Sequence, residues 1–271
     1  MTSIGSGLLA DKTAVVFGGG GAIGGAAARV FAREGARLFL AGRTESKLAA
    51  VARDIQSAGG HAEVAVLDVF DERAVNAHAD AVAAKSGGID IMLNAIGIAH
   101  IQGQPFAETS LAEFEVPITL TARAQFIAAQ AVARQMVKRK RGVILTLTTP
   151  GGRIAGKGFL SNGVFSAATE AFSRLLAAEL GGHGIRVVCL RPDAIPDAVA
   201  LSGAREVFEG VARRIGIPVH EMLAEHGRKG TLLGRLPHLS EVAEFAAFAA
   251  SDRAGAMTGA IANLTCGSMA D

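Results

Sequence analysis

The sequence predicts an α/β protein in which helices cover both faces of a doubly wound parallel sheet, giving three layers, α/β/α. Short β-branched runs alternate with longer amphipathic stretches, which is typical of βαβ units. A glycine-rich segment, residues 18–25, joins the first apolar run directly to a helical stretch. No repeat or linker interrupts the chain, and its 271 residues, half of them hydrophobic, can bury one core. We therefore expect a single domain over residues 1–271.

The first half is expected to alternate strands and helices regularly. The run at 13–17 is β-branched and apolar, and the run at 89–94 is almost continuously apolar, as in a strand covered on both faces. Acidic residues open the stretch at 71–86, which suits a helix N-terminus. The expected strands are 13–17, 36–41, 63–67 and 89–94, and the expected helices are 22–34, 44–58 and 71–86.

The second half begins with a long helical stretch at 111–140, which is expected to bend or restart at Pro117 because proline lacks an N–H. From 191 to 236 the alternation gives way to a segment rich in Gly, Pro, Arg and Glu. Such a long irregular segment in a compact domain is typically a lid or a substrate-binding element. The remaining expected strands are 142–148, 185–190 and 260–264, and the remaining expected helices are 163–180, 203–215 and 240–251.

The composition excludes several classes of function. No run of 18 apolar residues is present to span a membrane, and the N-terminus lacks the basic and apolar regions of a signal peptide. The densest basic cluster, 138–141, is interpreted as a helix end, so no nucleic-acid partner is expected. The two cysteines and the histidines lack metal-ligand spacing. We expect a cytoplasmic protein with no membrane partner and no metal.

The segment GGGGAIGG at 18–25 lies where a strand should lead into a helix. Glycine permits positive φ and close approach of a ligand, and the amides at a helix N-terminus attract a pyrophosphate. The fold is therefore expected to be of the Rossmann type, which binds dinucleotides at this turn. The candidate contacts are Gly18, Gly20, Ile23 and Gly24.

The same loop resembles the T-G-x-x-x-G-x-G motif of the short-chain dehydrogenase/reductase family. Phe17 stands where threonine is usual, and Ala22 replaces the middle glycine. Further likenesses follow in order over nearly the whole chain: LDV at 67–69, NAIG at 94–97, GIRV at 184–187, RPD at 191–193 and TG at 258–259. The resemblance implies further cofactor contacts from Asp68, Val69, Asn94, Gly97, Pro192 and Ile195.

The end of the second expected strand bears on the choice of dinucleotide. An acidic side chain there would bind the adenosine ribose of NAD(H) and repel a 2′-phosphate. The sequence instead has Arg43 and no carboxylate, and a guanidinium pairs well with phosphate. We expect NADP(H) to be favoured over NAD(H). The alternative is that Arg43 is only a solvated charge at a helix start.

The chain contains no tyrosine, although the family that it resembles uses a tyrosine phenol to transfer the proton. A lysine four residues later, a serine and an asparagine assist that phenol. Counting back from the GIR segment at 184–186 places the tyrosine position at Asn162 and the lysine position at Ser166, with the serine position at Thr149. Matching Phe126 and Met136 to the family's long helix places the asparagine position at Thr121. These groups form hydrogen bonds, but they do not readily exchange protons near neutral pH.

Other residues are candidates to replace the lost groups. His100 follows the NAIG segment at the expected carboxyl edge of the sheet, and imidazole titrates near neutrality. The alternative is an exposed loop histidine. Lys157 lies in the glycine-rich loop 151–163, away from the helix turn of the lysine position. Asp193 replaces a glycine that passes near the nicotinamide in the family, where a carboxylate would repel the cofactor or act as a base.

The first hypothesis is an NADP(H)-binding oxidoreductase with a non-standard or impaired proton-transfer site, acting on a small or medium apolar carbonyl or conjugated substrate. The alternatives are a non-catalytic nucleotide-binding regulatory protein and a non-redox isomerase or lyase that uses the same pocket. Ordinary ketone reduction is expected to be absent or very slow. The resemblance also implies a homotetramer or homodimer packed through the long helices 111–140 and 163–180.

Overall fold

The computed structural model describes residues 7–270, and within them the strands form a seven-stranded parallel sheet. The strand order is β3-β2-β1-β4-β5-β6-β7, so the winding reverses between β1 and β4. The strands are β1 (Thr13–Phe17), β2 (Arg37–Gly42), β3 (His61–Val66), β4 (Ile91–Asn94), β5 (Gly142–Leu147), β6 (Ile185–Pro192) and β7 (Ala260–Leu264). The predicted doubly wound sheet is confirmed, and open sheets of this kind bind ligands at the reversal point.

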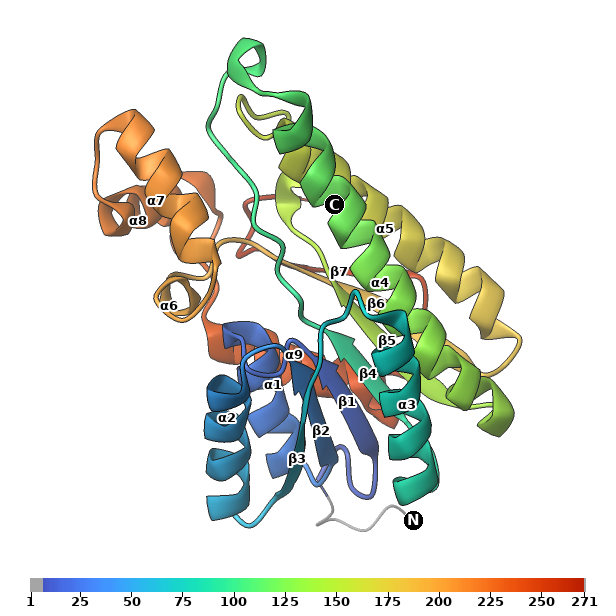
Figure 1. Cartoon of the computed structure of the whole chain (residues 1–271). Coiled ribbons are helices and arrows are strands. Elements are labelled where there is room, and N and C mark those ends of the chain that lie inside the picture. The colour runs from blue at the N-terminus through green and yellow to red at the C-terminus, as the bar shows by residue number, and fades with distance from the viewer. Residues whose placement is uncertain (1–6, 271) are drawn as a thin grey trace.

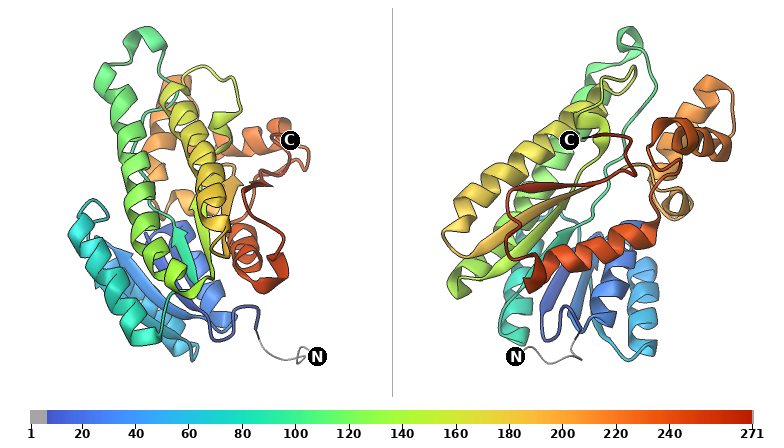
Figure 2. Two further views of the ribbon diagram at one scale, coloured as in Figure 1. Left: turned by 90° about the vertical axis from the view of Figure 1, so that its right-hand side faces the viewer. Right: turned by 180° about the vertical axis from the view of Figure 1, so that it is seen from behind.

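Successive side chains of each strand face opposite layers, and this alternation builds two apolar cores. Val16 belongs to the core under one helical layer, whereas the adjacent Val15 belongs to the core under the other. The first layer consists of α1 (Ala22–Arg33), α2 (Glu45–Ser57) and α9 (Leu239–Ala250), and the second of α3 (Glu72–Ser86), α4 (Leu111–Arg139) and α5 (Leu160–Gly181). Figures 1 and 2 show these layers on the two faces of the sheet.

Two helices differ from their predictions near the site. α4 runs unbroken through Pro117, so the predicted restart is wrong. A capping box between Ser110 and Glu113 begins the helix at Leu111, and the proline therefore falls in its second turn, where it removes one hydrogen bond near the helix start. α5 begins at Leu160 instead of 163, which places Asn162 in its first turn.

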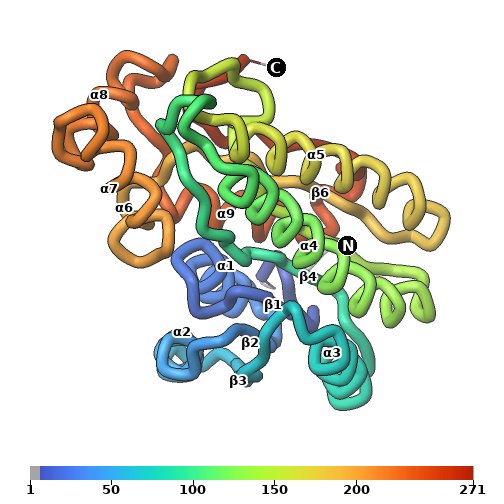
Figure 3. Tube along the Cα trace, turned by 45° about the horizontal axis from the view of Figure 1, so that its top comes forward, coloured from blue at the N-terminus to red at the C-terminus, as the bar shows by residue number. Residues whose placement is uncertain are grey.

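The segment 191–236 is more helical than the sequence predicts. It contains α6 (Pro196–Val199), α7 (Ala204–Ile215) and α8 (Val219–Gly230). The prediction anticipates α7 but misses α8, in which only Leu223 and Gly227 are buried. Figures 1 and 3 show the three helices gathered above α1, and they are called the lid below. No helix in the described part of the chain is long and apolar enough to cross a membrane.

Candidate functional site at the carboxyl edge of the sheet

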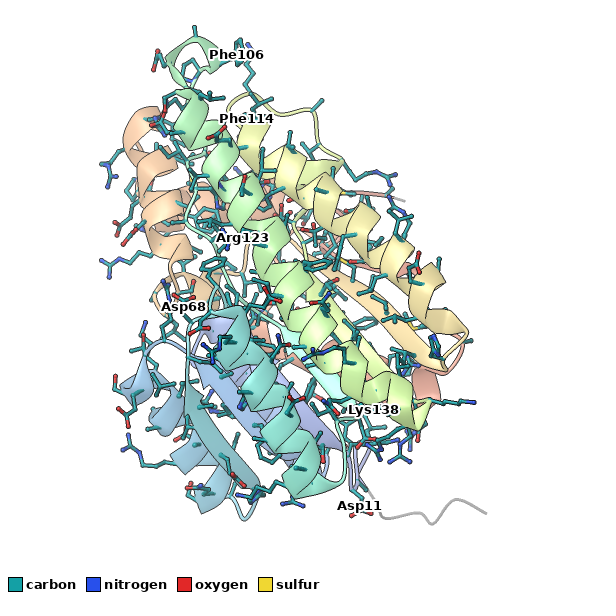
Figure 4. All side chains as sticks on the ribbon, turned by 45° about the vertical axis from the view of Figure 1, so that its right-hand side comes forward. Asp11, Asp68, Phe106, Phe114, Arg123 and Lys138 are labelled. Carbon is teal, nitrogen blue, oxygen red and sulfur yellow. The ribbon has the colours of Figure 1, made fainter. Side chains whose placement is uncertain are left out.

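The loops that follow β1 and β4 lie side by side at the carboxyl edge of the sheet. Phe17 and Asn94, the last residues of these strands, are register partners. The Phe17 carbonyl oxygen accepts a hydrogen bond from the Ala95 N–H at 2.9 Å. Asp68, two residues beyond the end of β3, is labelled at the same edge in Figure 4. The fold therefore gathers the glycine loop, the NAIG segment and Asp68 where the sequence predicts a dinucleotide.

The glycine loop packs so closely against neighbouring main-chain atoms that it has no room for side chains at Gly18 and Gly24. Gly18 has φ +76°, and a Cβ at this residue would stand 2.6 Å from the Ala95 carbonyl oxygen. A Cβ on Gly24 would stand 2.3 Å from the Gly18 carbonyl oxygen. The loop leads into α1, whose first amides have no partner within the helix. These residues fit a pyrophosphate group, which needs bare backbone and free N–H donors.

The start of α2 adds a second cation that sequence reasoning missed. A Cβ on Gly20 would stand 2.9 Å from the Lys47 Cβ, so α2 packs directly on the glycine loop. Arg43 and Lys47 are both exposed, and among residues 7–270 neither side chain has a hydrogen bond or an ion pair. The missing signal was the position of Lys47 in the first turn of the helix that Arg43 precedes, so that the two cations flank the start of α2.

The remaining predicted cofactor residues differ in what they contact. The Asn94 side-chain amide is buried and donates to the Ala124 carbonyl oxygen at 3.2 Å and to Gln125 Oε1 at 3.1 Å, so it ties β4 to α4. The Asp68 carboxylate is exposed and accepts from the Phe70 N–H. Gly97 is exposed and has open space around it. Buried Val69 packs in the core under α3 and α4.

Two more of these residues connect the glycine loop to the lid. Ile23 and Ile195 belong to one small apolar cluster, which joins the start of α1 to α6. Pro192 ends β6 and is the register partner of Leu264 in β7. The lid therefore begins on the same edge of the sheet as the glycine loop.

His100 lies in the loop after β4 and is held at both ring nitrogens. Nδ1 is 3.0 Å from the Ile98 carbonyl oxygen, and Nε2 is 2.9 Å from Gln102 Nε2 and 3.3 Å from Asn162 Nδ2. The ring packs edge-on against Phe165, with centroids 5.0 Å apart. The interpretation as an exposed loop histidine is wrong, because the ring is partly buried. Burial lowers the pKa of His100, although the hydrogen bond to Ile98 opposes the shift.

A chain of hydrogen bonds leads from Ser166 through Thr149 and Asn162 to His100, and each residue donates to the next. Thr149 Oγ1 donates to Asn162 Oδ1 at 3.0 Å, and Ser166 Oγ lies 2.8 Å from Thr149 Oγ1. Because the Thr149 hydrogen is already used, Ser166 donates to Thr149. The Asn162 NH₂ then points to His100 Nε2, and a nitrogen facing amide donors must carry the lone pair. In the neutral ring, this arrangement places the proton on Nδ1, which faces the Ile98 carbonyl oxygen, and the lone pair on Nε2.

Of the other catalytic candidates, Asn162 and Ser166 belong to the His100 network, whereas Thr121 and Lys157 lie outside it. Asn162 is 2% exposed and Ser166 is 0% exposed, so their side chains orient His100 and do not reach a substrate in this arrangement. Thr121, on α4, has no hydrogen bond to this network among the described residues. Lys157 is exposed in its loop. The sequence analysis missed Gln102 because glutamine has no titratable group to draw attention to it.

Gly151 makes room for the Asn162 amide. A Cβ on Gly151 would stand 1.8 Å from Asn162 Oδ1. We expect Gly151→Ala to displace that amide and to cost ~1–3 kcal/mol of stability, the usual range for overpacking. Denaturant unfolding measures the loss, with Gly181→Ala as the matched control, since nothing lies near a Cβ there. An unchanged midpoint for Gly151→Ala would show that the amide moves without cost.

Asp193 is engaged by the lid. Its Oδ2 lies 3.1 Å from His226 Nε2 of α8, and its Oδ1 accepts from the Ala194 N–H at 2.7 Å. Burial, the largest single influence, raises the pKa of Asp193. The hydrogen bond from His226 and smaller contributions lower it, and their sum is larger, so the net shift of the pKa is downward. The same hydrogen bond raises the pKa of His226. The carboxylate therefore fastens α8 to the end of β6.

A separate cavity of about 650 Å³ lies within the lid. Its lining is mainly apolar and includes Val199, Leu223 and Leu236 from three segments of the lid region. None of its lining residues belongs to the His100 network or to the glycine loop, so it is not part of the predicted site.

Comparison with known proteins finds that the chain is similar to a reductase family and to proteins named oxidoreductases. A family model described as enoyl-(acyl carrier protein) reductase matches residues 20–268. The uncharacterized oxidoreductase YuxG of Bacillus subtilis is 34% identical over 92% of this chain, which spans only 36% of that longer protein. The (+)-cis,trans-nepetalactol synthase NEPS1 of Nepeta racemosa is 31% identical over 93% of this chain and 88% of its own length.

Among solved structures, a 7α-hydroxysteroid dehydrogenase in complex with NADH and 7-oxo glycochenodeoxycholic acid superposes with a TM-score of 0.84. It is 28% identical to this chain, and the match covers 98% of each protein. The fold and the order of the loops at the carboxyl edge are thus shared with a protein that holds a nicotinamide dinucleotide.

Proposed function

We propose a function on the premise that the chain belongs to the short-chain dehydrogenase/reductase family. The proposal is an NADP(H)-dependent oxidoreductase of small molecules in which His100 takes over the proton transfer of the missing tyrosine. One observation carries it: His100 Nε2 lies 3.3 Å from the amide of Asn162, the residue at the tyrosine position. A titratable group is thereby brought to the point where the family's reaction needs one.

The geometry favours alcohol oxidation over ketone reduction. The lone pair of His100 Nε2 can accept the proton of a substrate hydroxyl, and the ring is held neutral by burial and by its donors. When bound, the oxidised dinucleotide would accept the hydride from the carbinol carbon. Asn162, Thr149 and Ser166 keep the imidazole oriented during the transfer. Ketone reduction needs the protonated ring, which this environment disfavours.

The preference for NADP(H) rests on charge. Exposed Arg43 and Lys47 flank the start of α2 beside the glycine loop, and neither is neutralised by a partner among residues 7–270. A 2′-phosphate would pair with both cations, whereas the 2′-hydroxyl of NAD(H) would gain little from them.

The experiment is a turnover assay with NADP⁺ and secondary alcohols, and with NADPH and the matching ketones, followed by dinucleotide absorbance. We expect faster oxidation than reduction at pH 8. Tight dinucleotide binding without turnover of any substrate would instead support a regulatory protein. Turnover of a substrate without change in absorbance would support a non-redox reaction, which is the second candidate because one relative is named a synthase.

The two long helices are proposed to form an interface between copies of the chain. Their exposed apolar side chains include Phe126 on α4 and Leu175 on α5, which are 53% and 68% exposed. Such faces suit an isologous contact. We expect a dimer or tetramer by light scattering at micromolar concentration, and a monomer for Leu175→Glu. Leu201→Glu, on the lid, is the control and should leave the mass unchanged; a monomeric wild type would exclude the interface.

A further inference from the structure

We propose that Gln102 is a positioning residue for His100. Its side-chain amide, kept in place by lid helix α7, donates to His100 Nε2 until a substrate hydroxyl replaces that amide. The inference rests on the proposed role of His100. It adds a residue outside the family's proton-transfer positions, and it links the lid to the chemistry.

The loop that carries His100 is clamped from two sides. Arg214 of α7 donates through one guanidinium nitrogen to the Gln102 carbonyl oxygen at 2.6 Å and through the other to Gln104 Oε1 at 2.8 Å. From the opposite side, the Gly103 N–H donates to the Gly158 carbonyl oxygen at 2.9 Å. A Cβ on Gly158 would stand only 2.5 Å from the Gly103 Cα, so the two loops are in backbone contact. Movement of α7 would therefore move Gln102.

The side-chain amide of Gln102 forms a hydrogen bond with His100 Nε2, the atom that accepts the proton in the proposed reaction. Its amide nitrogen lies 2.9 Å from His100 Nε2, closer than the 3.3 Å of Asn162. A neutral imidazole has one lone pair, on the nitrogen without a proton. A substrate hydroxyl that donates to Nε2 must displace Gln102 first. Until then, Gln102 satisfies the ring and keeps it turned toward Asn162.

Within residues 7–270, the groups that contact the His100 ring are uncharged. The loop contributes the Gln102 amide and the Ile98 carbonyl, and α5 contributes the Asn162 amide and the Phe165 ring. Arg214 reaches the loop through the Gln102 main chain, and its charge is not among the influences on the pKa of His100. Titration of His100 therefore reports whether the Gln102 amide is in place.

The test is an NMR titration of the His100 ring in the full chain without dinucleotide, with the signal assigned from His100→Gln. Gln102→Met keeps the length of the side chain but removes the donor. This variant should raise the pKa of His100 toward the ordinary value of imidazole, because the neutral ring loses a hydrogen bond. Arg214→Ala should produce a smaller upward shift by releasing the loop. Arg213→Ala is the matched control, because Arg213 pairs with Glu209 on the same helix.

A kinetic measurement separates positioning from a merely structural role. For alcohol oxidation, Gln102→Met should lower KM by roughly 2- to 10-fold, since the substrate no longer displaces a neutral hydrogen bond. kcat should stay close to the wild-type value, because Gln102 has already left Nε2 once the substrate is bound and Asn162 still orients the ring. The proposal would be overturned if Gln102→Met lowered kcat/KM only in step with the stability of the fold and left the pKa of His100 unchanged.

The outcomes also distinguish this inference from the proposed function. If Gln102→Met shifts the titration and Arg214→Ala does not, the link to α7 is wrong. If both shift it but His100→Gln retains full turnover, the clamp exists and the proton-transfer role of His100 is wrong. Arg214→Lys, which keeps the charge but not the two-pronged contact, should give an intermediate shift even if Arg214→Ala folds poorly.

Discussion

Replacement of His100 by glutamine is expected to lower turnover by about 10²- to 10⁴-fold, the usual contribution of a positioned general acid or base. Glutamine is polar and similar in length, but it cannot take up the substrate proton. Dinucleotide binding should be unchanged, since within residues 7–270 the ring contacts Ile98, Gln102, Asn162 and Phe165 and not the glycine loop. Initial rates measure the first effect, and fluorescence titration with NADPH measures the second.

The pH profile of the wild type gives an independent check. Oxidation needs the neutral ring, and burial, the largest influence, lowers the pKa of His100 from its ordinary value of about 6.5. The oxidation rate should therefore be constant at neutral and higher pH and fall as the pH drops through that lowered pKa. Reduction needs the protonated ring, so its rate should rise over the same acidic range.

The control for His100 is His183→Gln, because His183 is exposed beyond the end of α5. It should leave both the rate and the pH profile unchanged. Full activity of His100→Gln would show that another group transfers the proton. The partly buried Asp193, held by His226, would then be the next residue to replace.

The sequence predicts the fold well because its signals are local. The glycine run after 13–17 and the nearly continuous apolar strands follow from backbone geometry and from burial on both faces. The clearest misses in the fold, the unbroken passage of α4 through Pro117 and helix α8, depend on capping and on a lid that buries few residues. The capping box of Ser110 and Glu113 is a local signal that the prediction did not use. The position of α8 depends on contacts between distant residues, such as that of His226 with Asp193.

The site is less predictable because its groups come from distant segments. The sequence places His100 and Asn162 on candidate positions, but only the folded chain brings them to 3.3 Å, across 62 residues of sequence. Gln102 and Lys47 go unnoticed because they match no family motif. Thr121 is proposed by matching Phe126 and Met136 to a long helix, and within residues 7–270 it makes no hydrogen bond to the His100 network; Gln125, one turn later, accepts a hydrogen bond from Asn94. Counting along a helix fixes the register of a face, and it does not show which side chain makes the contact.

Replacement of Arg43 by alanine is expected to weaken NADPH binding by about 10- to 100-fold, as expected for a lost hydrogen-bonded charge pair with phosphate. NADH binding should change little, because its ribose lacks the phosphate. Lys47→Ala should act in the same direction with a smaller effect, since a lysine makes a single point contact. Equilibrium fluorescence titration of each variant with both dinucleotides gives the ratio that defines the preference.

The fragment adenosine 2′,5′-bisphosphate isolates this contribution from the nicotinamide half of the cofactor. It should bind the wild type more tightly than AMP, and Arg43→Ala should remove most of that difference. Arg37→Ala is the matched control: Arg37 is an exposed arginine at the amino end of β2, whereas Arg43 directly follows the carboxyl end of that strand beside the glycine loop. If Arg43→Ala keeps the wild-type ratio, Arg43 is a solvated charge at the start of α2. Retention of the ratio in the double variant with Lys47→Ala would exclude both cations from the 2′-phosphate site.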